Sequence, residues 1–201
     1  MKFLYKLLRF STSLFIQGAK LYKLDLAEFS RNTPSELPDK FSFYMPESSD
    51  FELLDIFFAD IPRRIDTAKE RFSSGNYLCF AYIDNTCNKL AYVRWACRES
   101  YYSEAMRQEL KFSSNEILTM DSYTHPDYRS LGLHRLMNTE MLVWIKNNTD
   151  FRYVYMIILL YVNHIKKIAI RLGYKPVKRA IFFSFEGSRN YLRLILKKLN
   201  G

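Results

Sequence analysis

The feature that most constrains this chain is a stretch in its middle where a predicted strand passes through a short turn into a predicted helix. Residues 117–124 are apolar and β-branched, which is typical of a strand, and Pro126 ends that pattern. After the turn Arg129–Gly132, apolar side chains recur at helical spacing over residues 133–144. The first N–H groups of such a helix lack intrahelical acceptors and lie at the positive end of its dipole. The stretch therefore indicates a binding site for an anion such as phosphate.

Three residues of the turn refine this prediction. Gly132 lets the main chain come close to a ligand, and Arg129 can either contact an anion or brace the turn. His134 can bond a phosphate, cap the helix or pack against its neighbours. From these residues alone, an ordinary strand–turn–helix connection is the simpler interpretation.

Two motifs resemble the GNAT superfamily of acetyltransferases. The segment THPDYRSLGL, residues 124–133, is similar to that family's strand end, proline, aromatic residue and Arg-x-x-Gly-x-Gly/Ala turn, which cradles the pyrophosphate of acetyl-coenzyme A. Asn163, a predicted helix over 165–172 and Gly173-Tyr174 are similar to the family's Asn, short helix and Gly-Phe segment. The resemblance covers roughly residues 41–187. It implies an α/β (α+β) fold with a mixed, mostly antiparallel central sheet flanked by helices.

The order of the other predicted elements agrees with that scaffold. Ser48 is a candidate N-cap for the first helix, and Pro62 begins the second. We predict strands over residues 41–45, 77–83, 89–98, 117–124 and 153–160, and helices over residues 48–58, 62–74 and 165–172, besides the helix after the turn.

The resemblance also implies a cofactor site for acetyl-coenzyme A as co-substrate. Backbone amides near Tyr123 and Thr124 would polarise the thioester carbonyl. The basic C-terminal part of the chain would favour the cofactor's phosphates, with Lys166, Lys167 or Arg171 as a contact. The cofactor-binding residues predicted in this way are Tyr123, Thr124, Arg129, Ser130, Leu131, Gly132, Leu133, His134, Asn163 and Lys166.

The implied reaction is direct attack of an amine on the thioester, for which a base must remove the proton of the amine. Asp121 lies within a predicted strand, where a carboxylate is unusual, although a structural ion pair would explain it equally well. Glu116 and His125 are further candidates for the base. Tyr123 and Tyr161 are candidate acids or pocket walls.

Three positions depart from the family pattern. His134 stands where a small residue is usual, and the spacing from Asn163 to Gly173 is one residue short. The helical tyrosine that many members use as a proton donor has no counterpart, because Ala169 and Ile170 occupy that region. The missing tyrosine and the altered spacing after Asn163 favour, as one alternative, a regulator that binds acyl-coenzyme A without turnover.

No metal is expected, because the three histidines lack a partner at metal-ligand spacing and the three cysteines lack metal-type spacing. The odd number of cysteines favours a reducing compartment, so we expect a cytoplasmic protein. No apolar stretch is long enough to cross a bilayer.

Residues 1–25 combine apolar and basic positions at helical spacing, which predicts a basic amphipathic helix. We divide the chain into this helix with its connector, residues 1–38, and an acetyltransferase domain, residues 39–201. The helix would pack on the domain, pack on a second subunit in a homodimer, or contact the inner face of the membrane.

The function predicted from the sequence is acetyl-coenzyme A-dependent N-acetyl transfer to a primary amine of a small molecule or amino sugar. A protein or peptide amine acetyltransferase is an alternative, although the formal charge of +9 favours acidic substrates. A nucleic-acid adaptor is disfavoured because no recognised nucleic-acid module is present. The fold alone does not select the acceptor.

Overall fold

The computed structural model describes residues 14–30, 37–185 and 191–194, and the chain divides into two compact units. The larger unit contains residues 24–101 and 111–156. The smaller unit contains the described parts of residues 1–23, 102–110 and 157–201.

The larger unit is built on a mixed sheet with the strand order β8-β7-β4-β3-β2. Neighbouring strands are antiparallel, apart from β7 and β8, which are parallel. Strand β8 contributes only its first residues to this unit. The strands are β2 (Phe41–Tyr44), β3 (Tyr77–Asp84), β4 (Lys89–Cys97), β7 (Glu116–Thr124) and β8 (Tyr153–Leu159).

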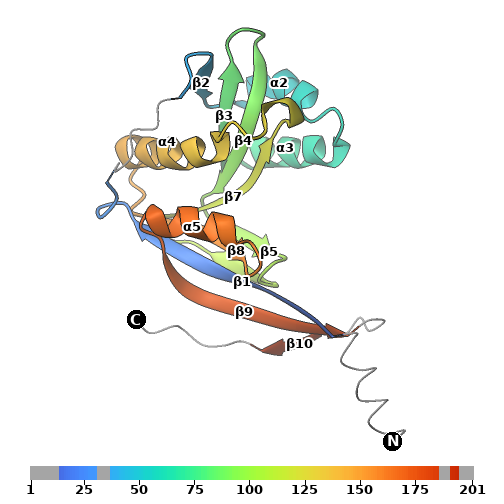
Figure 1. Cartoon of the computed structure of the whole chain (residues 1–201), viewed down its shortest axis with the longest axis vertical. Coiled ribbons are helices and arrows are strands. Elements are labelled where there is room, and N and C mark those ends of the chain that lie inside the picture. The colour runs from blue at the N-terminus through green and yellow to red at the C-terminus, as the bar shows by residue number, and fades with distance from the viewer. Residues whose placement is uncertain (1–13, 31–36, 186–190, 195–201) are drawn as a thin grey trace, which may run out of the picture. The chain divides into compact units, whose positions relative to one another are not determined.

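Helices cover both faces of this sheet (Figure 1). On one face, Trp144 of α4 packs on Phe80 of β3. On the other face, Phe72 of α3 packs on Trp95 of β4. Since side chains alternate along a strand, every second residue of β3 and β4 serves one helical layer. The helices of this unit are α2 (Phe51–Phe57), α3 (Pro62–Ser74) and α4 (Leu133–Asn148), with the short 3-10 turns η1 (Ser48–Asp50) and η2 (Pro126–Tyr128).

The smaller unit contains β1 (Leu14–Asp25) up to Lys23, α5 (Asn163–Arg171), β9 (Lys175–Phe185) and β10 (Tyr191–Leu194). Strand β9 pairs antiparallel with both β1 and β10. Gly18 lies close to the main chain of β9, because a Cβ atom there would come within 2.4 Å of the Ala180 carbonyl oxygen. The missing side chain therefore permits this pairing of β1 with β9.

The structure corrects the predicted N-terminal helix. Residues 14–25 form strand β1 and pair with β9, whereas residues 1–13 lie outside the described part of the chain. Leu21 and Tyr22 are both buried, and the register of β1 against β9 shifts between them. A strand buried on both faces, with a bulge, loses the alternation that identifies strands in sequence. Its apolar and basic residues then imitate a helical pattern.

The other predicted strands and helices are present, with ends that agree to within a few residues. The structure adds a two-stranded sheet that the sequence did not reveal, made of β5 (Ser100–Ser103) and β6 (Gln108–Lys111). The first predicted helix is divided into η1 and α2, and Glu47 rather than Ser48 occupies the N-cap position of η1. The connector predicted before residue 38 lies largely outside the described residues. Within the described ranges, no helix is long and apolar enough to span a bilayer.

Candidate active site

The predicted anion-binding turn is formed, and it leads directly into α4. Ser130 and Gly132 both have positive φ angles, 66° and 75°. Gly132 is the N-cap residue of α4, and its carbonyl oxygen accepts hydrogen bonds from the backbone amides of Arg135 and Leu136. No side chain caps this helix and no acidic residue stands in its first turn. The first amides of α4 are therefore suited to an external anion.

Two side chains of the turn make contacts within the protein. Arg129 Nε donates to the Thr124 carbonyl oxygen at 3.5 Å, so it braces the turn against the end of β7. His134 Nδ1 lies 2.8 Å from the hydroxyl oxygen of Tyr92, which is fully buried. Burial raises the pKa of Tyr92, which keeps its hydroxyl neutral. The packing role that the sequence allowed for His134 is thus the one its contacts favour.

Strand β7 leads into this turn, and it is irregular at Asp121, the residue predicted as a candidate base. Its parallel register with β8 is recorded from Glu116 to Thr119, whereas its pairing with β4 continues to Thr124. Two consecutive residues of β4, Arg94 and Trp95, pair with Ser122 and Met120 of β7. Asp121 therefore has no partner in β4 and is the extra residue of a bulge. Asp121 has a φ angle of 34°, which is uncommon for a residue with a side chain. Bulges of this kind redirect a side chain and occur often beside active sites.

The Asp121 carboxylate is held by Arg71 of α3. Asp121 Oδ2 accepts a hydrogen bond from Arg71 Nη2, and the pair is also an ion pair. Arg71 is buried between two aromatic rings, with its guanidinium carbon 5.1 Å from the Trp95 ring centre and 5.4 Å from that of Tyr77. The Asp121 side chain remains 44% exposed. Arg71 therefore fixes the carboxylate while leaving it accessible.

The bulge opens onto a pocket of about 390 Å³ between α3 and the sheet. Three arginines and one carboxylate line it, so its formal charge is positive. Arg64 of α3 also stacks on the ring of Tyr123, with 4.9 Å between the guanidinium carbon and the ring centre. We call this pocket the basic pocket; its lining residues are Phe58, Ile61, Arg63, Arg64, Thr67, Arg71, Trp95 and Asp121.

Tyr123 itself is packed into an aromatic cluster at the end of β7. Its ring lies 5.6 Å from that of Phe57 and 5.7 Å from that of Phe58. Arg64 and Arg129 approach the same ring. These contacts favour a role for the Tyr123 side chain as a wall of the site rather than as a proton donor. The backbone of Tyr123 and Thr124 lies beside the turn.

Glu116 lies at the start of β7, five residues before the bulge. It accepts hydrogen bonds from the Tyr155 hydroxyl at 2.6 Å and from the Ser113 backbone amide at 3.0 Å. Burial and this hydrogen bond raise the pKa of Tyr155, so its hydroxyl stays protonated and donates. The contacts of Glu116 favour a structural role.

A second pocket, of about 790 Å³, lies between η1, α2, the turn after β3 and η2. It contains His125, whose Nδ1 accepts from the Asp127 amide at 3.4 Å and lies 3.5 Å from the Asp127 carboxylate. We call it the acidic pocket, because Asp50, Glu52 and Asp127 line it together with only one basic residue, Lys89.

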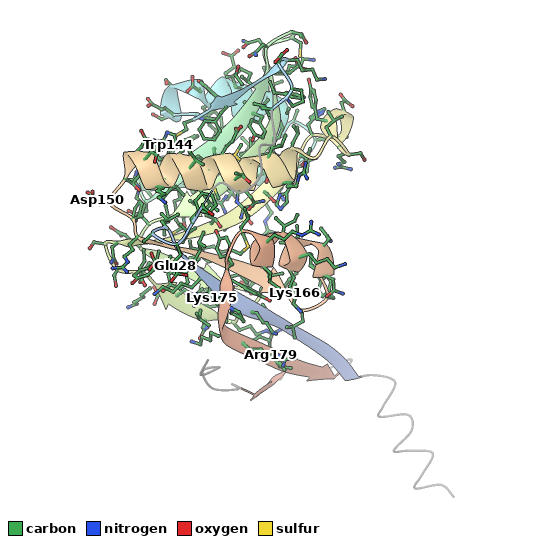
Figure 2. All side chains as sticks on the ribbon, turned by 60° about the vertical axis from the view of Figure 1, so that its left-hand side comes forward. Glu28, Trp144, Asp150, Lys166, Lys175 and Arg179 are labelled. Atoms are coloured by element: carbon green, nitrogen blue, oxygen red, sulfur yellow. The ribbon has the colours of Figure 1, made fainter. Side chains whose placement is uncertain are left out.

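Asn163 and Lys166 belong to the smaller unit, at the start of α5. Both are exposed, as is Tyr161 just before them. Figure 2 labels Lys166. Lys166 lies among other cations. The pKa of Lys20 is lowered first by burial and then by the positive charges of Arg179 and Lys166. The roles predicted for Asn163, Lys166 and Tyr161 stay predictions.

Among the residues that the structure describes, no group of three or more His, Cys, Asp or Glu side chains is arranged to hold a metal ion. The cysteines are all free, with Cys79 and Cys97 buried and Cys87 exposed in the acidic pocket.

Comparison with known proteins rests on structure alone, because neither a protein-family model nor a curated sequence matches this chain. A tandem GNAT protein from the clavulanic acid biosynthesis pathway aligns with a TM-score of 0.60 and 12% identity over 87% of this chain and 55% of its own. The glucosamine N-acetyltransferase region of a fungal multi-domain β-N-acetylglucosaminidase aligns with a TM-score of 0.61 and 14% identity over 92% and 23%. AAC(6')-Iy, in complex with the bisubstrate analogue CoA-S-monomethyl-acetylneamine, aligns with a TM-score of 0.50 and 11% identity over 67% and 90%.

These likenesses define the class of fold, which is a mixed α/β sheet with helices on both faces. This is the fold of the GNAT superfamily, as the two sequence motifs predicted. The chain spans about half of the tandem protein and a quarter of the fungal enzyme.

The sequence did not reveal the arginines of the basic pocket. Arg63, Arg64 and Arg71 lie fifty or more residues before Asp121, in a helix whose basic residues resemble an ordinary solvated face. The spacing of seven residues between Arg64 and Arg71, two helical turns, was the available signal.

Proposed function

We propose that this chain is an acetyl-coenzyme A-dependent N-acetyltransferase that acts on a primary amine of a small molecule or amino sugar. The observation that carries the proposal is the uncapped start of α4, with Ser130 and Gly132 in the left-handed region, directly after a strand whose bulge presents Asp121 to a pocket. The GNAT fold supports the same activity.

The turn would bind the pyrophosphate through the backbone amides of residues 130–134. Left-handed residues within a turn direct successive N–H groups toward one point, which creates an anion-binding concavity. The main chain of Tyr123 and Thr124 would bind the arm of the cofactor, because that part of β7 pairs with β4 but, among the described residues, not with β8.

Acetyl transfer would then occur at the bulge. The lone pair of the amine nitrogen attacks the thioester carbonyl carbon, a C–N bond forms, and the C–S bond breaks. Of the two protons that leave the ammonium group, one passes to solvent through Asp121 and one ends on the departing sulfur. Asp121 suits the first transfer because only Oδ2 is engaged by Arg71; within the described residues, Oδ1 has no hydrogen-bond partner.

The second candidate, a regulator that binds acyl-coenzyme A without turnover, is favoured by one observation: Ala169 and Ile170 stand where many family members carry the acidic tyrosine. The two candidates differ in one measurable outcome. Thiol release that depends on both acetyl-coenzyme A and an amine would exclude the regulator.

Both candidates require binding of acetyl-coenzyme A at the turn. The test of this binding compares two glycines that have similar backbone conformations. Gly132 has a φ angle of 75° and Gly75, the C-cap of α3, has one of 67°; a Cβ atom at either position meets nothing within 4 Å. Each Gly→Glu change should cost about 1–2 kcal/mol of stability, since a side chain is strained in this region. Gly132→Glu should also abolish binding of acetyl-coenzyme A, by placing bulk and negative charge at the turn.

Calorimetric titration of acetyl-coenzyme A into both variants and the native protein measures this difference. Gly75→Glu should bind like the native protein, which separates the loss of the site from the loss of stability. Equal binding by Gly132→Glu would exclude the turn from the site, and no binding by the native protein would end the proposal.

A further inference from the structure

We infer that the acceptor amine carries an anionic group, a carboxylate or a phosphate, which is bound in the basic pocket by Arg63 and Arg64. This inference rests on the proposed function and narrows its substrate. Two of the cations that line the pocket have no carboxylate partner among the residues that the structure describes.

The three arginines of the basic pocket are not equivalent. Arg71 is buried and its charge is matched by Asp121. Arg63 and Arg64 make no ion pair with any carboxylate among the residues that the structure describes. The pocket therefore has an uncompensated charge of two on one wall, α3, opposite the strand that carries Asp121.

The position of Arg63 and Arg64 in α3 strengthens the attraction of the pocket for an anion. Arg63 and Arg64 lie in the first turn of a 13-residue helix, where the helix dipole is positive, and no acidic residue stands in that turn. Cations are unfavourable at this end of a helix, and an anion in the pocket would offset that cost.

The guanidinium of Arg64 is also held in place. It stacks on Tyr123 and lies 5.7 Å from the ring centre of Phe58. A planar guanidinium fixed on aromatic rings keeps its N–H edge for bidentate contact with a carboxylate or phosphate. The same stacking ties the pocket to Tyr123, whose backbone lies beside the turn.

Charge also selects against other acceptors. An amine without an anionic group would bring a single ammonium charge to a pocket with a net positive lining, and would be repelled. An acceptor with both groups can bring its ammonium to Asp121 and its anion to Arg63 and Arg64. The pocket is thus suited to a zwitterionic or phosphorylated amine of small size.

The experiment compares amines that differ only in the anionic group. Thiol release from acetyl-coenzyme A is measured with glucosamine 6-phosphate against glucosamine, and with serine against serinamide. The first pair tests a phosphate and the second a carboxylate. The anionic member of at least one pair should have a kcat/KM at least about tenfold higher, since a hydrogen bond to a charged group gives about one to two orders of magnitude.

Variants then identify the residues responsible. Arg63→Gln and Arg64→Gln should each reduce the ratio of kcat/KM for the preferred anionic amine to kcat/KM for its neutral partner by about 10- to 100-fold. Lys69→Gln is the matched control, because Lys69 lies on the same helix and has the same charge but does not line the pocket. Arg63→Gln and Lys69→Gln should bind acetyl-coenzyme A like the native protein, and thermal unfolding checks that all three variants are folded.

Binding without acetyl-coenzyme A separates this inference from the proposed function. Calorimetric titration of the same four amines should give heat only with an anionic member, and Arg63→Gln and Arg64→Gln should remove it. If no amine is acetylated but this binding pattern holds, the enzyme proposal fails and the anion specificity stands. If neutral amines react or bind as well as their anionic partners, or if neither member of either pair binds, the inference is overturned.

Discussion

The two pockets of the larger unit differ in charge more than in position. Both lie beside the end of β7 and near the C-terminal end of α2, since Phe57, the last residue of α2, lines one and its C-cap residue Phe58 lines the other. The acidic pocket has about twice the volume and contains His125, Tyr128 and the thiol of Cys87. Only the basic pocket contains the bulged residue of β7.

We expect the reaction in the smaller, basic pocket, because the backbone of β7 is irregular there and not beside the acidic pocket. In the acidic pocket, His125 and Asp127 are engaged with each other at the start of η2, as helix caps commonly are. In the basic pocket, a strained backbone position presents a carboxylate that a buried arginine holds. Strained positions of this kind concentrate at functional sites.

The largest expected difference between the two pockets is in kcat, when one aspartate of each pocket is changed to asparagine. Asp121→Asn should lower kcat by about 100-fold or more, because the amide cannot accept the proton of the amine. Asp127→Asn, the matched change in the acidic pocket, should alter kcat by less than about twofold. Steady-state thiol release measures both. A larger loss in Asp127→Asn would move the reaction to the acidic pocket.

A smaller effect is expected on stability when the arginines of the basic pocket are compared. Arg71→Met should cost about 1–3 kcal/mol, because it breaks the pair with Asp121, whose exposure screens part of the interaction. Arg64→Met should cost less than about 1 kcal/mol, since Arg64 loses only its ring contacts. Urea unfolding with equal slopes gives both values. Equal costs would mean that Arg71 does not anchor the bulge.

The smallest effect is expected from alkylation of the acidic pocket. Burial raises the pKa of the Cys79 and Cys97 thiols, so both stay protonated near neutral pH and react slowly. Iodoacetamide should therefore modify the native protein once, at the exposed Cys87. Mass spectrometry counts the label. Acetyl transfer should stay within about twofold of the unmodified protein, and its abolition would show that the acceptor uses the acidic pocket.

Much of the fold could be predicted from the sequence, because local patterns were strong where one face of an element is buried. The helix starting at Pro62, the hairpin of β3 and β4, and the turn at Gly132 all carry local signals. The strand at residues 14–25 could not be predicted, since burial on both faces and a bulge removed its alternation. Its partner, β9, lies more than 150 residues further along the chain, and no local pattern reports such a pairing.

Some residues of the candidate site could likewise be predicted from local sequence, whereas the role of one of them could not. Arg129, Gly132 and Asp121 were identified from sequence because the turn and a carboxylate within a strand are local features. Whether Asp121 is catalytic or structural was left open, and its contacts explain why: it is paired with an arginine and still exposed to a pocket.

The local sequence was enough to predict a strand, a turn at Gly132 and the start of a helix, because backbone conformation depends strongly on neighbouring residues. What faces Asp121 depends on how distant elements pack. The three arginines reach the pocket because α3 packs across the sheet opposite the bulge, and charge in a pocket is a sum over residues that are distant in the chain.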